Sequence, residues 1–290
     1  MAIVMTAEEA ALESPGRFRR VPLGTVLLRV ALIGALLYLT LPLLATVLFS
    51  LATVWSKSIL PEGYTLEWYK EAVTDKLFLP TATHTLQATI GAAIISPLLV
   101  VPALLAVHLR APKWKPALEF LSIIPWALPG VVLALAMIRA YVNPYNVNRT
   151  ALLILTYVLL SLPFMFRSID ASLTSIDART LSEAAQMLGA GWFDIGRRVL
   201  VPGIMPGLMS GILLIAALGA GEYALASLLA GSGWKTFPIY QAQAQNVDGR
   251  IASALAVIGL LYVMVVSLSL LYIAGRRRGG AGPGMPVANK

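Results

Sequence analysis

The sequence predicts an all-α integral membrane protein with six transmembrane helices and one short cytoplasmic helix. Only 12% of the 290 residues are charged and 58% are apolar, whereas soluble domains carry roughly 25% charged residues. The apolar residues form long continuous runs and do not alternate with polar ones, which excludes a membrane β-barrel. The mean hydropathy of +0.78 excludes a soluble enzyme and a disordered chain.

Six runs are long and apolar enough to cross the core of a bilayer, which takes about 20 helical residues. They cover residues 30–53, 86–107, 117–138, 151–166, 199–220 and 252–274. The third run is interrupted by Glu119, Pro125 and Pro129, and the fourth is the shortest. The first run exceeds the roughly 7–15 residues of a signal-peptide core, so we expect it to remain as a membrane anchor.

Lys and Arg residues set the expected orientation. With the N-terminus inside, 15 of the 22 Lys and Arg residues fall on the cytoplasmic side, as the positive-inside rule requires. Residues 1–29, 167–198 and 275–290 are then cytoplasmic, and both termini lie in the cytoplasm. Because the basic residues are scattered between apolar runs and not gathered on one soluble domain, no nucleic-acid partner is expected.

Residues for catalysis are missing from the sequence. There is no cysteine, and the two histidines, His84 and His108, would lie about 35 Å apart on one straight helix. We therefore predict no catalytic residue and no metal site. The segment nearest to a P-loop, residues 231–236, has Trp234 where the loop needs glycine. This chain is thus expected to bind no cofactor itself.

Two patterns within the runs leave alternatives open. Prolines in most runs fit either ordinary packing of membrane helices or helices broken around a translocation path. Glu222, at the end of the fifth run, either lines such a path or makes a structural hydrogen bond. Three glycines spaced by four allow close helix packing, within this chain or against a partner. They are Gly203, Gly207 and Gly211.

Residues 180–189 predict a short amphipathic helix on the cytoplasmic side. Its apolar face consists of Leu181, Ala184, Ala185 and Leu188, and its polar face of Ser182, Glu183 and Gln186. Thr180 and Glu183 have the spacing of a capping box at the helix start. Gly189 is a natural helix stop. From these residues alone, the helix could lie on the membrane, act as a plain loop helix capped by Glu183, or dock on a partner.

The same segment resembles the signature of the permease subunits of bacterial binding-protein-dependent ABC importers of type I. That signature is Glu-Ala-Ala, three residues, Gly, nine residues and Ile-x-Leu-Pro, with a further proline four residues later. Here the matching positions are Glu183, Ala184, Ala185, Gly189, Val199, Pro202 and Pro206. With the layout of the runs, the resemblance covers about 84–274, which implies a permease domain in the bacterial plasma membrane.

The resemblance implies a mechanism and partners. The helix at 180–189 would be a coupling helix that docks in a groove of a separate ATPase, which binds ATP and magnesium. Glu183 would meet a basic or polar group there, while Ala184, Ala185 and Leu188 would lie at the contact and Gly189 would make the turn. A second permease subunit, of the same or another chain, and an extracytoplasmic binding protein would complete the importer.

Leu188, directly before the motif glycine, and the outer segment 60–69 resemble the branch of the family that handles polyamines, ferric iron or phosphonates. In the sugar-importing branch the position before the glycine is usually Asp. The expected function is therefore import of a small polar solute, and sugar import is the alternative. A polytopic membrane enzyme and a secondary transporter are weaker alternatives, because neither explains the spacing between Glu183 and Pro206.

Overall fold

The computed structural model describes residues 23–56, 58–231 and 233–278. Within these ranges the chain is helical and has no strand, and a single bridge joins Ala52 to Tyr64, so the predicted all-α fold class is confirmed. The chain divides into two units, residues 1–48 and 49–290. Helix α1 (Leu23–Leu51) begins in the first unit, and its leucines from Leu27 to Leu44 are exposed, as a lipid-facing surface requires.

The other helices of the described residues follow in chain order. They are α2 (Glu67–Thr74), α3 (Phe78–Arg110), η1 (Pro112–Trp114), α4 (Lys115–Ala127), α5 (Gly130–Met137), η2 (Ile138–Val142), α6 (Asn143–Tyr145), α7 (Arg149–Ser175), α8 (Ala178–Met187), α9 (Trp192–Asp194), η3 (Ile195–Leu200), α10 (Val201–Gly203), α11 (Met205–Gly221), α12 (Ala224–Leu229), α13 (Phe237–Gln245) and α14 (Gly249–Arg278). In this part of the chain, four helices are long and apolar enough to cross a membrane, or up to six if each of two bent pairs is one span.

The third and fifth runs form these bent pairs, not straight helices. The pair Pro112–Ala127 and Gly130–Tyr145 bends by 96°, because Pro129 forces the residue before it, Leu128, into an extended conformation with ψ 132°. The pair Trp192–Gly203 and Met205–Gly221 bends by 64°. The helices are therefore broken at these two places, while a translocation path around the breaks stays a prediction.

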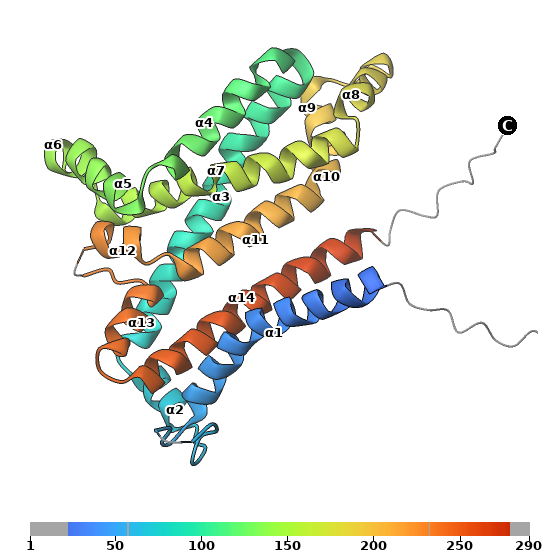
Figure 1. Cartoon of the computed structure of the whole chain (residues 1–290). Helices are drawn as coiled ribbons and strands as arrows, with labels where there is room; N and C mark the ends of the chain where they lie inside the picture. Colours follow the sequence, from blue (N-terminus) through green and yellow to red (C-terminus); the bar gives the residue numbers. More distant parts are fainter. Residues whose placement is uncertain (1–22, 57, 232, 279–290) are drawn as a thin grey trace, which may run out of the picture. The chain divides into compact units, whose positions relative to one another are not determined.

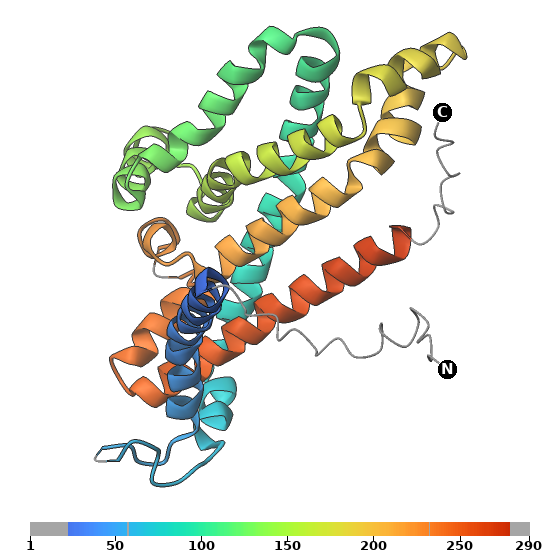
Figure 2. The same ribbon diagram turned by 45° about the vertical axis from the view of Figure 1, so that its right-hand side comes forward.

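Helix α7 is the centre of the second unit. It packs against α3, α4 and α11 (Figures 1 and 2), and Met165, Ile169 and Leu173 on it are fully buried. The fourth run, expected to be the shortest, is thus part of a 27-residue helix. It reaches Ser175, so the first residues of the predicted soluble stretch 167–198 are the end of α7.

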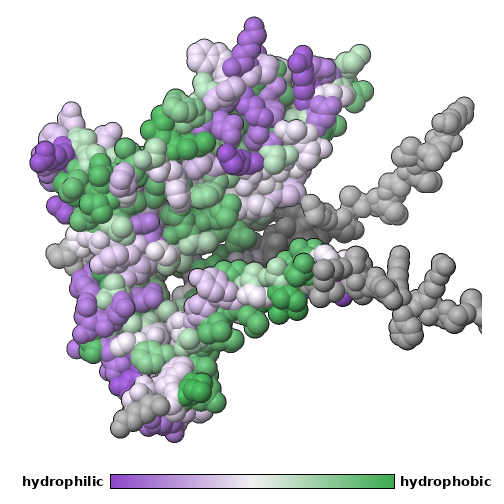
Figure 3. All heavy atoms as spheres, viewed as in Figure 1, coloured by the Kyte–Doolittle hydropathy of each residue, from purple (hydrophilic) through white to green (hydrophobic). Residues whose placement is uncertain are grey.

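A second, smaller core joins α2, α13 and the start of α14. Arg250 holds this end together: its guanidinium pairs with Asp248 at 2.6 Å and stacks on the Trp68 ring at 4.0 Å. We call it the α13 end of the second unit, and the opposite end the α8 end. On the face shown in Figure 3, polar residues gather near α8 and near α13, with mostly apolar residues between them.

Candidate functional site

Helix α8 begins at a cap that the sequence did not reveal. Asp177 takes the left-handed conformation, with φ 46°, and its side chain accepts a hydrogen bond from the Thr180 backbone N–H at 3.4 Å. The predicted capping box of Thr180 and Glu183 is therefore wrong, because the helix starts two residues before Thr180. The Glu183 carboxylate instead accepts a hydrogen bond from Arg179 Nε at 2.9 Å, one helical turn away.

The helix ends at Gly189, as predicted. Gly189 has φ 83°, a conformation that costs residues with a side chain roughly 1–2 kcal/mol. Its N–H donates to the Gln186 carbonyl at 2.9 Å, and the Ala190 N–H donates to the Ala185 carbonyl at 3.1 Å. This pair of bonds is a Schellman motif, which fixes the direction in which the chain leaves α8.

Most of the predicted apolar face of α8 points away from its own chain, but Ala185 is half-buried and packs against the main apolar cluster. Ala178 and Ser182 are buried against the protein, although Ser182 was expected on the polar side. Leu181, Met187 and Leu188 are 42%, 90% and 89% exposed, and Glu183 and Ala184 are also exposed. The helix therefore presents an apolar edge with one carboxylate beside it. We call Leu181, Ala184, Met187 and Leu188 the docking edge; Figure 1 shows α8 at an extremity of the second unit.

The chain after α8 returns to the core through two anchors that sequence reasoning missed. Ile195 and Leu200 are buried and join the main apolar cluster. They are five residues apart in the π-helical segment η3, a spacing that a search for a 3.6-residue period overlooks. Of the signature residues here, Val199 is half-buried, while Pro202 and Pro206 are exposed and lie at the starts of α10 and α11.

The three spaced glycines, Gly203 in α10 and the other two in α11, place these helices directly against α7 and its C-terminal end. A Cβ atom on Gly203 would lie 2.7 Å from Ile176 Cδ1, and one on Gly211 would lie 2.6 Å from Met165 Sδ. At Gly207 the obstacle is backbone, since a Cβ would collide with the Ser168 carbonyl oxygen and lie 2.9 Å from its carbon. The glycines therefore serve packing within this chain.

Ion pairs brace the base of α8. Asp170 on α7 contacts His108 Nε2 at 2.6 Å and Lys115 Nζ at 2.8 Å, which ties α3 and α4 to α7 about two helical turns before α8. Arg167 and Glu119 pair at 3.6 Å, so the acidic residue of the third run has a partner. In the described ranges, no three His, Asp or Glu side chains are placed to hold a metal ion.

Arg110 at the end of α3 lies over the Trp192 ring of α9, with 4.7 Å from the guanidinium carbon to the ring centroid. This cation–π contact fixes the far side of the loop. Together with the ion pairs, it ties the base of the α8 loop to α3, α4 and α7.

The sequence left two roles open for Glu222, and the structure shows one of them, a structural hydrogen bond. Its Oε1 accepts from the Leu225 N–H at 2.8 Å and so caps α12. The residue also lines a cavity of about 440 Å³ together with Trp126 and Leu160. A role for Glu222 in a translocation path stays a prediction.

Comparisons with known proteins agree on the kind of protein that this fold and site define. Residues 99–278 match the family described as binding-protein-dependent transport system inner membrane component. That is more than half of the chain, and the chain belongs to this family. It is a permease subunit of a binding-protein-dependent importer and a component of the inner membrane.

Two relatives come from the branch that the sequence resembles. The chain is 29% identical over 249 residues to a Salmonella typhimurium protein named as the 2-aminoethylphosphonate transport system permease PhnV, itself a provisional assignment. The match covers 83% of this chain and 89% of the relative. This chain is also 23% identical to the spermidine/putrescine transport system permease PotC of Escherichia coli K12. That match covers 76% of this chain and 84% of PotC. The resemblance to the branch of phosphonate and polyamine permeases is thereby confirmed.

A solved structure shares the fold. The crystal structure of a bacterial ABC transporter that imports the acidic polysaccharide alginate contains a chain with a TM-score of 0.66 to this one. The match covers 89% of this chain and 99% of that chain, at 18% sequence identity. The predicted ABC importer permease architecture is confirmed.

Proposed function

We propose that this chain is one of two permease subunits of an ATP-driven importer, and that α8 is the coupling helix that docks on a separate ATPase. The observation that carries the proposal is the docking edge, whose apolar side chains the chain itself leaves uncovered. The sequence has no Gly-x-x-x-x-Gly-Lys-Ser/Thr segment, so ATP and magnesium would be bound by that partner. The second permease subunit is the same or a different chain.

The packing suggests how movement of the ATPase reaches the membrane helices. Because Ala178 and Ser182 bury one side of α8, a push on the docking edge passes into the protein and does not fold α8 aside. Gly207 brings α11 into backbone contact with α7, so both helices move together with α8. The result is the rigid tilting of helices that alternating access requires.

We propose that the α8 end faces the cytoplasm and the α13 end faces outward, where a binding protein delivers the solute. The bias of Lys and Arg supports this orientation. Because the chain has no cysteine, Gln241→Cys on α13 adds a single thiol. A membrane-impermeant maleimide should label it in right-side-out vesicles and not in inverted vesicles. Labelling only in inverted vesicles would reverse the topology.

The solute that we propose is a small phosphonate or polyamine, since the relatives above are named for such solutes. The test is uptake by proteoliposomes that contain the permease with its own ATPase and binding protein. Labelled 2-aminoethylphosphonate and spermidine are the probes, and maltose represents the sugar alternative. ATP-dependent uptake of one of the first two is expected. Uptake of maltose alone would reject the proposed solute class, and uptake without ATP would reject the coupling.

Glu183→Gln should leave the fold intact and weaken the ATPase complex. The Arg179–Glu183 pair is exposed, and such a pair within a helix stabilises by only about 0.3–0.5 kcal/mol. A charged hydrogen bond to the ATPase is worth roughly 1.5–3 kcal/mol, so its loss should weaken association about ten-fold or more. Surface plasmon resonance with the purified ATPase would measure this.

Arg179→Gln is the matched control for Glu183→Gln. It breaks the same pair within α8 but keeps the Glu183 carboxylate, so it should bind the ATPase at least five-fold better than Glu183→Gln. Equal affinities for the two variants would mean that Glu183 contributes through Arg179 alone.

A further inference from the structure

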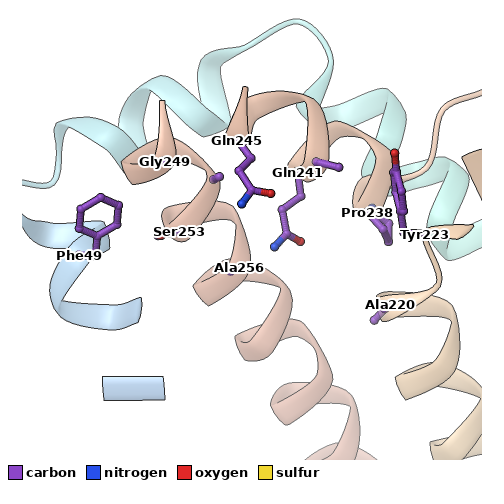
Figure 4. Close-up of a pocket in the computed structure, with 12 residues that line it drawn as sticks. Phe49, Ala220, Tyr223, Pro238, Gln241, Gln245, Gly249, Ser253 and Ala256 are labelled. Carbon is purple, nitrogen blue, oxygen red and sulfur yellow. The ribbon is translucent and has the colours of Figure 1, made fainter. Parts of the chain in front are cut away.

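A pocket at the α13 end has the form of a site for a small solute. It holds about 430 Å³, lies between the end of α11, α13 and the first turns of α14, and is lined on one side by Phe49. Ala220, Gly221, Ala252 and Ala256 supply small side chains that leave it open. Figure 4 shows Gln241 and Gln245 extending from one face of α13 into this space, with Ser253 on α14 nearby.

The polar groups of the pocket are free to bind a ligand. In the described part of the chain, the amides of Gln241 and Gln245 and the hydroxyl of Ser253 make no hydrogen bond. Gln243 on the same helix differs, since its Oε1 accepts from Lys235 Nζ at 3.1 Å and it does not line the pocket. Gln245 is exposed, and Gln241 and Ser253 are half-buried, so their polar groups can reach water or a solute.

We propose that this pocket is a contact site for the transported solute, which Gln241, Gln245 and Ser253 bind through neutral hydrogen bonds. The inference rests on the proposed function and extends it to named residues. An amide both donates and accepts, so two amides suit a solute that carries both kinds of group, such as an aminophosphonate. The volume fits a molecule of that size.

The pocket lining carries no charge, which fits a site that binds the solute weakly and releases it during transport. None of the residues that line the pocket is acidic or basic. On adjoining segments, Asp248 and Arg250 pair with each other at 2.6 Å, and the Glu222 carboxylate accepts a hydrogen bond from the Leu225 N–H at 2.8 Å. A solute held by neutral groups alone binds loosely enough to leave, which conduction through a path requires.

The pocket is also placed to change with the transport cycle. Ala220 and Gly221 form part of its wall and are the last residues of α11. The same helix begins at the α8 loop and packs on α7 through Gly207. Movement of α11 by the coupling helix would therefore open or compress the pocket against α13.

The test compares a double variant with a single control variant in the reconstituted importer described above. Gln241→Leu with Gln245→Leu should lower uptake of the imported probe, 2-aminoethylphosphonate or spermidine, at least about ten-fold, because two hydrogen bonds are lost. Gln243→Leu, which removes an amide from another face of α13, should retain uptake within about two-fold. ATP hydrolysis stimulated by the binding protein shows that each variant is folded and assembled, and it should persist in both.

Ser253→Cys supplies a direct readout that does not depend on the double variant folding. It places the only thiol of the chain in the pocket with little change of size, and the imported probe should slow its reaction with a small methanethiosulfonate reagent at least three-fold. Ser227→Cys on α12, outside the pocket, should react at the same rate with and without the probe.

The outcomes separate this inference from the function on which it rests. If the wild-type importer takes up a probe and the double variant takes it up equally fast, the pocket is not a solute site and the proposed function stands. Lack of protection at Ser253→Cys would likewise show that the solute does not occupy the pocket. If the wild-type importer takes up neither probe, the proposed solute class fails and this inference fails with it.

Discussion

Gly207→Ala should strongly destabilise the folded permease. The added Cβ would collide with the Ser168 carbonyl oxygen and lie 2.9 Å from the carbonyl carbon, and backbone cannot rotate out of the way as a side chain can. Overpacking of this kind costs about 1–3 kcal/mol, occasionally more, and a clash with backbone belongs at the upper end. Thermal unfolding in detergent, followed by size-exclusion chromatography, should show a clearly lower melting temperature and little intact protein.

Gly196→Ala is the matched control for Gly207→Ala. A Cβ at Gly196 meets no atom within 4 Å, and this glycine lies in η3, a few residues before α11. The control should melt within a few degrees of the wild type. Equal melting temperatures for the wild type and Gly207→Ala would show that α7 and α11 do not pack as closely as described.

The second large effect is expected from Leu188→Asp on the docking edge. Leu188 is 89% exposed in the permease alone, so the change should alter folding by no more than about 0.5 kcal/mol. In the complex, burial of a leucine is worth roughly 1.5–3 kcal/mol, and a buried carboxylate without a partner adds a further penalty. We expect association with the ATPase to weaken about 100-fold or more, with loss of ATP-driven uptake.

Val247→Asp serves as the control for that substitution. Val247 is 83% exposed but lies at the α13 end, away from α8. It should co-purify with the ATPase as the wild type does. If Leu188→Asp also co-purifies fully, the docking edge does not touch the ATPase.

The sequence was sufficient for the fold class and for the position of α8. Long apolar runs dictate membrane helices whatever their packing, and Gly189 reveals the end of α8 because few other residues accept its positive φ. The start of α8 could not be read as easily. Asp177 and Thr180 are both good capping residues, and only the left-handed turn at Asp177, which tertiary packing fixes, decides between them.

The apolar run at residues 151–166 underestimated the length of α7, which extends from Arg149 to Ser175. The helix is the most buried of the long spans, yet it carries Thr156, Ser161, Arg167 and Asp170. These residues lower the average over a window, although Ser161 contacts Ser96 at 2.5 Å and Asp170 forms ion pairs at the end of the helix. Partners that satisfy such groups are invisible in a sequence, so the run seemed shorter than the helix is.

The pocket at the α13 end was also beyond sequence reasoning. Gln241 and Gln245 lie on a nine-residue helix with no strong amphipathic pattern, and Ser253 belongs to a different span. Only the fold of α13 back toward α14 brings them together. By contrast, the glycines at 203, 207 and 211 were predictable as packing residues because their spacing alone puts them on one helical face.

The central claim is that α8 couples this permease to a separate ATPase, and cross-linking from Leu188 tests it most directly. Because the chain has no cysteine, Leu188→Cys carries the only thiol of the permease, and a maleimide with a photoreactive group can be attached there before the importer is assembled with its ATPase. The account predicts a cross-linked product of one permease and one ATPase chain, whose yield changes when ATP is bound, and no such product from Gln241→Cys. Cross-links from Leu188→Cys to lipid alone, in an importer that still takes up solute, would contradict it.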